Sequence, residues 1–251
     1  IRLGEMMGQF LARRTIGNDA LAHVIGHFDE LLIAEAMVVG TPLVDKTLAE
    51  CNFREMSHTS VVGVWDRGEY KGAGPDTKLS ESTVLVLAGS KEMIQNYNQL
   101  FCIYQTEESH VVIIGGGRVG RATARALAKR GLRYTIIEEL PERIRNKKYY
   151  VEGSAARIEV LEEAKIREAS TVIITTGQDD TNIYLTIYCR KLCPEIQVIS
   201  RANTERNVGT LHRAGADFVA SYASMGANII FNLLKHSDIL MVAEGLNVFR
   251  I

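Results

Sequence analysis

The chain of 251 residues has 29 Lys and Arg against 30 Asp and Glu, and with 46% hydrophobic and 24% charged residues it has an ordinary globular composition. That composition excludes a disordered chain, a collagen-like repeat and a disulfide-rich mini-protein. The most apolar stretch, residues 31–39, contains Glu35 and is far shorter than the roughly 18 apolar residues of a membrane span, so we expect a soluble chain.

The first part of the chain, residues 1–109, is acidic, with 9 basic and 15 acidic residues. The chain starts at Ile1 without an initiator Met, so we expect the whole chain to be a piece of a longer protein. A helix is predicted over residues 3–14 and is ended by the turn-forming residues 17–19. The strand-like runs that follow are 31–39, 60–65 and 84–87, and the helical segments between them are 45–50 and 91–99. These short elements indicate a small α+β module that ends near residues 105–109.

The second part, residues 110–251, is basic, with 20 basic and 15 acidic residues, and it alternates between strand and helix. The apolar run 110–114 is typical of a strand buried on both faces of a parallel sheet, and Gly131 is expected to stop the helix 118–130. The other predicted strands are 134–137, 149–151, 171–175, 197–200 and 218–220, and the other predicted helices are 158–164, 180–192, 205–213 and 224–235. A last strand is predicted at 246–251. Six strands alternating with helices predict an α/β fold, a Rossmann-like doubly wound parallel sheet.

The glycine-rich sequence after the first of these strands, Gly115-Gly116-Gly117-Arg118-Val119-Gly120, fits G-x-G-x-x-G. Gly115 would allow the tight turn, Gly117 the approach of a pyrophosphate, and Gly120 the close packing of helix and strand. Glu138 follows at the end of the next strand, where a carboxylate accepts hydrogen bonds from a ribose and repels a 2′-phosphate. We therefore expect NAD(H) or an adenine nucleotide rather than NADP. The alternative is a glycine turn that is kept for packing and binds nothing.

Ligands of such sheets lie beyond the carboxyl ends of the strands, so the other strand ends also supply candidates. These are Gly153 and Ser154 after the third strand, Thr176 and Gly177 after the fourth, and Arg201 after the fifth. Arg201 could bind a phosphate through two parallel hydrogen bonds, or it could form a salt bridge to a neighbouring helix. Ten basic residues within 118–148 also favour an anionic ligand nearby.

Motifs of catalysis are absent from the sequence. None of the nine tyrosines has a lysine four residues later, and there is neither a Gly-x-Ser-x-Gly elbow nor a His-Glu-x-x-His zinc helix. The basic residues lack interleaved aromatic side chains, which argues against nucleic-acid binding. We therefore predict a binding protein rather than an enzyme.

Two spacings are compatible with metal ligands. His23 and His27 are four residues apart with Glu30 close behind, and Cys189 and Cys193 have the same spacing on a predicted helix. Both spacings also arise from helical periodicity, and the cysteines are expected to face the core. Calcium would need converging carboxylates, for which Asp29, Glu30 and Glu35 are the candidates. The cysteines, with Cys51 and Cys102, form no paired framework and no CxxC pattern, which favours a reducing cytosol.

Motifs across most of the chain resemble the RCK (regulator of K+ conductance) domains, also called TrkA-N and TrkA-C, of prokaryotic potassium channels and transporters. The segments similar to TrkA-N are 111–120, 136–138, 160–164, 176–182, 198–203 and 214–217, and those similar to TrkA-C are 40–48, 60–64 and 84–90. Asn182 and Gly215-Ala216-Asp217 are more specific to this family than the glycine loop, and the resemblance adds Asn182 to the candidate binding residues. The sequence departs from the family pattern in two places. After the third strand, Ser154-Ala155-Ala156 lacks the carboxylate that in the family often faces the adenosine half of the ligand. Before the last C-lobe strand, Ser80-Glu81-Ser82-Thr83 replaces the usual family sequence.

The C-lobe precedes the N-lobe, so the resemblance implies the end of a first RCK unit followed by the start of a second. Residues 1–27 would be the crossover helix and linker of the first unit, 28–105 its TrkA-C-like C-lobe, and 106–251 a TrkA-N-like lobe with its own crossover helix at 222–236. Such tandem units resemble the gating ring of potassium channels of the GsuK type, or a peripheral subunit of a Trk or Ktr transporter.

The resemblance further implies a regulatory role. Binding of NAD(H), ADP, ATP or AMP, or of a divalent cation such as Ca²⁺, would change the angle between paired lobes and so gate a membrane pore for potassium ions. The expected partners are further copies of the chain, as a tetramer of tandem units, and a pore domain in the same or another chain, at the cytoplasmic face of the membrane. The rival hypotheses are an NAD-dependent oxidoreductase with an unrecognised active site and a scaffold whose pocket is degenerate.

Overall fold

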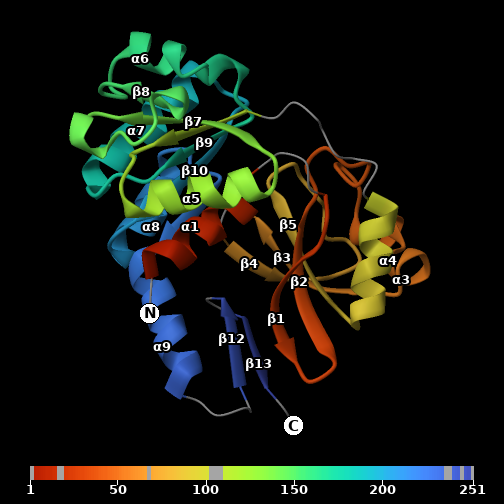
Figure 1. The fold of residues 1–251 in the computed structure, drawn as a ribbon. Coiled ribbons are helices and arrows are strands. Elements are labelled where there is room, and N and C mark those ends of the chain that lie inside the picture. Colours follow the sequence, from red (N-terminus) through yellow and green to blue (C-terminus); the bar gives the residue numbers. More distant parts are fainter. Residues whose placement is uncertain are drawn as a thin grey trace. The chain divides into compact units, whose positions relative to one another are not determined.

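The computed structural model describes residues 3–15, 20–66, 69–101, 110–234, 239–243 and 246–249. The chain forms two compact units (Figure 1). We call residues 1–17 and 107–226 the parallel-sheet unit, and residues 18–106 and 227–251 the antiparallel-sheet unit.

The parallel-sheet unit is built on six strands in the order β11-β10-β9-β6-β7-β8, all parallel to their neighbours. The strands are β6 (His110–Ile114), β7 (Arg133–Glu138), β8 (Tyr150–Glu152), β9 (Thr171–Ile174), β10 (Gln197–Ala202) and β11 (Phe218–Ser221). The helices are α5 (Arg118–Lys129), α6 (Ile158–Glu163), α7 (Asp179–Leu192), α8 (Val208–Arg213) and α9 (Tyr222–Leu234), with 3-10 turns η2 (Pro141–Arg143), η3 (Lys147–Tyr149), η4 (Ile166–Glu168) and η5 (Glu205–Asn207). The strand order reverses between β6 and β9, as in a dinucleotide-binding sheet, and confirms the predicted doubly wound fold.

Each face of the parallel sheet packs against its own hydrophobic core, because alternate side chains of a strand point to opposite faces. Val112 and Ile114 of β6 belong to a cluster that includes residues of α6 and α7. Val111 and Ile113 belong to a second cluster that includes residues of α5. Burial on both faces explains why β6 is a continuous apolar run in the sequence.

Helix α1 (Leu3–Arg13) packs on α5 within the parallel-sheet unit, although the whole antiparallel sheet separates the two helices in sequence (Figure 1). Met7 and Leu11 are fully buried in the second cluster. The two backbones approach closely at Gly8, where a Cβ would lie 2.4 Å from the Cβ of Ala122. Beyond the helix, the side-chain amide of Gln197 donates to the carbonyl of Arg14 at 2.9 Å.

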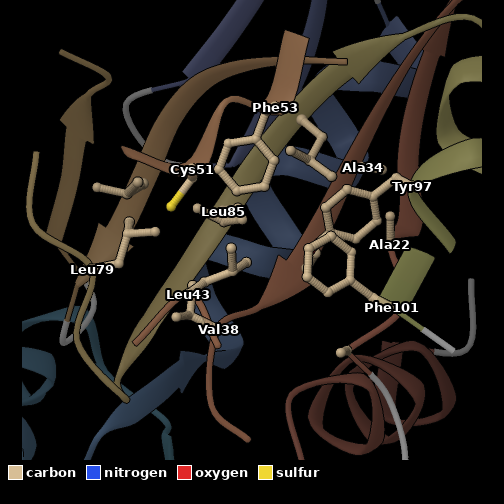
Figure 2. Packing of buried hydrophobic residues seen from close by; sticks show 14 of the residues in the cluster. Ala22, Ala34, Val38, Leu43, Cys51, Phe53, Leu79, Leu85, Tyr97 and Phe101 are labelled. Atoms are coloured by element: carbon tan, nitrogen blue, oxygen red, sulfur yellow. The ribbon is translucent and has the colours of Figure 1, made fainter. Parts of the chain in front are cut away.

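The antiparallel-sheet unit contains five strands in the order β1-β2-β5-β3-β4. Their bounds are β1 (His23–Phe28), β2 (Leu31–Met37), β3 (Ser60–Asp66), β4 (Glu69–Gly72) and β5 (Thr83–Gly89), and the helices are α2 (Leu48–Cys51), α3 (Phe53–Met56) and α4 (Lys91–Phe101). Strands β12 (Ile239–Ala243) and β13 (Leu246–Phe249) form a separate antiparallel pair. Figure 2 shows the aromatic core, in which the rings of Tyr97 and Phe101 lie 4.5 Å apart between centroids and Phe53 stacks on Tyr97.

One predicted helix of this unit begins later than expected, and two of its strands, β1 and β4, were not predicted. The helix predicted over 45–50 starts only at Leu48, because Thr47 and Glu50 form a capping box in which Glu50 Oε2 accepts from the backbone N–H of Thr47 at 2.7 Å. Strand β1 was not predicted, since it lacks a clear apolar alternation and contains Gly26. Strand β4 was not predicted either, because its residues were assigned to a turn-rich stretch.

The domain boundaries expected from the resemblance remain a prediction. Residues 1–27 were expected to form one segment, whereas α1 packs in the parallel-sheet unit and β1 in the antiparallel sheet. The predicted crossover helix 222–236 corresponds to α9, which ends at Leu234 in the described residues, and the two compact units divide within it, between residues 226 and 227.

Candidate functional site

A cavity of about 890 Å³ opens at the carboxyl ends of the parallel strands. It lies where the strand order reverses, which is the ligand position in open parallel sheets. The predicted binding residues that line it are Gly115, Gly117, Arg118, Val119, Glu138, Gly153, Ser154, Thr176, Gly177 and Arg201. Loops that are far apart in the sequence thus meet at one site.

The glycine loop has the geometry that its spacing predicted. Gly115 adopts a φ of +102°, which an L side chain rarely accepts. A Cβ at Gly120 would lie 1.9 Å from the carbonyl oxygen of Gly115, so only glycine allows α5 to approach β6 this closely. A Cβ at Gly117 would meet no atom within 4 Å, so the space beside this residue is open. Gly117 is also the N-cap of α5 and has no side chain, which leaves the first N–H groups of the helix for an anion.

Glu138 is 5% exposed and holds the glycine loop in place. Its Oε2 accepts from the backbone N–H of Gly116 at 2.8 Å, and its Oε1 accepts from that of Leu140 at 3.0 Å. Arg143 lies 4.0 Å from Oε2. Since each carboxylate oxygen has a second lone pair, Glu138 can still accept from a ribose hydroxyl at the cavity wall.

Arg201 is a half-buried cation in this cavity. Its guanidinium lies 4.7 Å from the ring centroid of Tyr222 and donates to the side chain of Asn203. Burial lowers the pKa of Arg201, and the neighbouring Arg118 acts in the same direction. None of the described residues places a carboxylate within salt-bridge distance of Arg201, so the predicted alternative of a structural salt bridge is not what the structure shows.

Asn203 is itself held by Asp179 at the start of α7. The Asp179 carboxylate accepts from the backbone N–H and the amide of Asn203 at 2.7 and 2.9 Å, and also from Thr204 and Asn207. Burial alone would raise the pKa of Asp179, but these hydrogen bonds outweigh it and hold the pKa below its usual value. The amide of Asn203 also donates to the carbonyl of Gly177 at 3.0 Å, which ties the loop after β9 to the end of β10.

Asn182 supports the cavity from behind and does not line it. It is fully buried, its Nδ2 donates to the carbonyl of Arg201 at 2.8 Å, and its Oδ1 accepts from the hydroxyl of Thr176 at 2.6 Å. Gly120 is likewise outside the cavity wall. Asn182 thus positions two of the residues that line the cavity, and its own contact with the ligand stays a prediction.

Several lining residues were not among the predicted site residues. They are Gly4, Arg121, Glu139, Leu140, Glu142, Arg143, Arg145, Ala155, Thr181, Tyr184 and Tyr222, among others. The excess of basic residues over 118–148 was the signal for Arg121, Arg143 and Arg145. Tyr184 and Gly4 carry no comparable signal, because their position depends on how α7 and α1 pack.

The metal candidates do not form a site in the described part of the chain. No group of three or more His, Cys, Asp or Glu residues there could hold a metal ion. His23 lies on strand β1 rather than on a helix, so the helical spacing of His23 and His27 that we considered does not apply. Cys189 is fully buried in the core, where burial raises its pKa to about 12, and Cys193 packs against the same cluster.

None of the helices in the described ranges is both long and apolar enough to cross a membrane. The apolar stretch 31–39, which was predicted to be strand-like, contains strand β2 and confirms that prediction.

Residues 111–222 match the family model of the TrkA-N domain, and residues 33–101 match that of the TrkA-C domain. A Trk system potassium uptake protein TrkA homolog of Pyrococcus abyssi is 34% identical over 155 residues, which cover 56% of this chain and 68% of that relative. The probable potassium channel protein 2 of Methanocaldococcus jannaschii is 30% identical over 124 residues, which cover 47% of this chain and 36% of that one.

Among solved structures, the GsuK channel bound to NAD has a TM-score of 0.77 and 40% sequence identity. The similarity covers 93% of this chain and 42% of that chain. The chain therefore spans less than half the length of the two channel proteins that it resembles.

Proposed function

The chain belongs to the RCK family, which is built from TrkA-N and TrkA-C domains, and from this we propose that it is a ligand-sensing part of a potassium channel. It binds NAD(H) or an adenine nucleotide at the loop from Gly115 to Gly120 and is not a catalyst. Binding changes the angle between paired lobes, and this motion gates the pore. By linkage, the ligand acts only if it binds one arrangement of the lobes more tightly than the other.

The observation that carries this proposal is the open space at Gly117 beneath an uncapped helix start. The backbone N–H groups of α5 face a cavity in which Arg118 and Arg201 form no ion pair with a described residue. Such a cradle fits the pyrophosphate of a dinucleotide or the phosphates of a mononucleotide. The NAD-bound state named for the GsuK channel supports this assignment.

The adenosine half of the ligand is assigned to the side of Glu138. The buried carboxylate would accept from the ribose hydroxyls and repel a 2′-phosphate, which favours NAD over NADP. Gly153 and Ser154 line the same cavity. Because Ser154 stands where the family has a carboxylate, the adenine contact is expected to depend on fewer charged groups in this chain.

The larger assembly belongs to the proposal as well. In this proposal the chain lies at the cytoplasmic face of the membrane, in a ring of several copies of itself. The pore that it gates lies in the same chain or in a partner chain. The Pyrococcus relative supports a second candidate, a peripheral subunit of a potassium uptake system. The two are distinguished by purifying the full-length protein from membranes, since a channel forms a potassium-selective pore by itself and a subunit requires a transporter.

Calorimetric titration with NAD, NADH, NADP, ADP, ATP and AMP tests the site. We expect saturable binding of NAD(H) or at least one adenine nucleotide, weaker binding of NADP, and no consumption of ligand. Gly117→Asp should abolish binding by steric and charge conflict, whereas the control Gly72→Asp should not, because Gly72 also has open space around it but lies on β4 of the other unit. Turnover of NADH that Gly117→Asp removes would favour an oxidoreductase, and unchanged binding in Gly117→Asp would indicate a degenerate pocket.

A further inference from the structure

A second cavity, of about 360 Å³, lies between the first turn of α1 and one face of α5. Three arginines of α5 line it, Arg118, Arg121 and Arg125, together with Glu5 of α1 and Tyr222. We call it the arginine cavity. Its residues all belong to the parallel-sheet unit.

The charge of the arginine cavity is unbalanced. Residues three and four positions apart share one face of a helix, so α5 places three guanidinium groups in a row, where like charges repel. Glu5 is the single carboxylate among the lining residues and forms an ion pair with Arg125. Arg121 donates to the carbonyl of Gly116 at 2.6 Å, and Arg118 forms no ion pair within the described part of the chain. A mobile anion would relieve this excess of positive charge.

The arginine cavity adjoins the nucleotide cavity. Gly4, Arg118, Arg121 and Tyr222 line both. The helix start of α5 is occupied when a nucleotide phosphate binds there, but Arg125 lies about two turns farther along α5 and lines only the arginine cavity. A phosphoryl group bound at Arg125 therefore lies beyond the phosphates that contact the glycine loop itself.

We propose that the arginine cavity is a second anion site that takes a phosphoryl group, and that Glu5 occupies part of it when no ligand is bound. The phosphoryl group comes either from a free anion such as pyrophosphate or from the outer phosphates of a nucleoside triphosphate seated at the glycine loop. Arg118, Arg121 and Arg125 donate to its oxygens, since guanidinium groups bind phosphate through charge-assisted hydrogen bonds. The anion competes with Glu5 for Arg125, so its binding also loosens one contact between α1 and α5.

Competition by Glu5 gives variants with opposite effects. Arg125→Gln removes a charged donor and should weaken anion binding by at least about tenfold. Glu5→Gln removes the internal competitor and should strengthen it by about two- to fivefold, the range of an exposed ion pair. Arg206→Gln is the matched control, because Arg206 is exposed on η5 and lines neither cavity.

The experiment is calorimetric titration of the chain at constant ionic strength, in two arms. In the first, pyrophosphate is titrated after NAD has saturated the nucleotide cavity. In the second, ATP and AMP are compared without NAD. A decrease in pyrophosphate affinity in Arg125→Gln supports a free anion as the source, and a decrease for ATP but not for AMP supports the nucleotide.

The proposal is overturned if Arg125→Gln changes the affinity neither for pyrophosphate nor for ATP, or if Glu5→Gln lowers both affinities. It is also overturned if Arg206→Gln has the same effect as Arg125→Gln. Thermal unfolding and NAD affinity of each variant show that it is folded. If neither NAD(H) nor any adenine nucleotide binds the wild-type chain, the proposed function fails, and titration of pyrophosphate without NAD still tests the arginine cavity.

Discussion

The substitution Gly117→Ala separates ligand binding from folding. A Cβ at this position meets no atom within 4 Å, and the backbone at φ −67° and ψ −166° is extended and open to any residue. The folded chain should therefore keep its stability or gain about 0.4–1 kcal/mol, because alanine restricts the unfolded chain. The added methyl group nevertheless occupies the space through which phosphates approach the N–H groups of α5.

The expected loss of affinity follows from the hydrogen bonds at stake. Displacing a phosphate from one charge-assisted N–H bond costs about 2 kcal/mol, or roughly 30-fold in dissociation constant. At a ligand concentration of about 100 times the wild-type dissociation constant, NAD should stabilise the wild-type chain by about 2.7 kcal/mol and the variant by only about 0.9 kcal/mol.

The assay is chemical denaturation with and without NAD, with Gly72→Ala as a control that also adds a methyl group in open space. A full NAD-dependent stabilisation of Gly117→Ala would refute the reasoning, because the ligand would then not contact the start of α5. A loss of stability without NAD would show that the space at Gly117 is not free.

Three further predictions concern stability. Gly120→Ala should destabilise the chain by about 1–3 kcal/mol or more in denaturant titrations, because its Cβ would lie 1.9 Å from the carbonyl of Gly115. Gly8→Ala should release α1 from α5, because the new Cβ would lie 2.4 Å from the Cβ of Ala122. The release should be seen as faster proteolysis near the N-terminus, and an unchanged rate of cleavage would contradict the close packing. The pKa of Asp179 is lowered in the folded chain, so its contribution to stability is present above the unfolded pKa of about 3.9 and is lost as the pH falls through the lower folded value. Melting temperatures of Asp179→Asn should therefore depend less on pH below about 4 than those of the wild type, and an unchanged dependence would show that Asp179 does not contribute.

The glycine loop could be predicted because its requirements are local. The positive φ of Gly115 and the close approach at Gly120 are consequences of one strand, one turn and one helix, all of which the sequence marks within a few residues. The alternation of strand and helix likewise follows from local patterns of apolar residues. These are the parts of the fold and the site for which expectation and structure agree.

The features that were missed depend on packing between distant segments. The pattern of α1 indicates an amphipathic helix, but not which core receives its buried Met7 and Leu11. Strand β1 forms because it pairs with β2, and a β-bulge between Val24 and Gly26 accommodates its irregular pattern. The hydrogen bonds of Asn182 to Thr176 and Arg201 could not be predicted for the same reason, since they join strand ends that lie apart in the sequence.

Arg201 shows how a polar network decides between a structural and a binding role. The sequence allows Arg201 either a salt bridge or a ligand, and Asp179 is a carboxylate that the fold brings near enough to act on the pKa of Arg201. Asp179 is already engaged by Asn203, Thr204 and Asn207, and Asn203 in turn holds the guanidinium of Arg201. The guanidinium is thereby fixed in direction while its charge stays without a carboxylate partner among the described residues. An arginine that is oriented but not neutralised is preorganised for an anion, because binding then costs little ordering of the side chain.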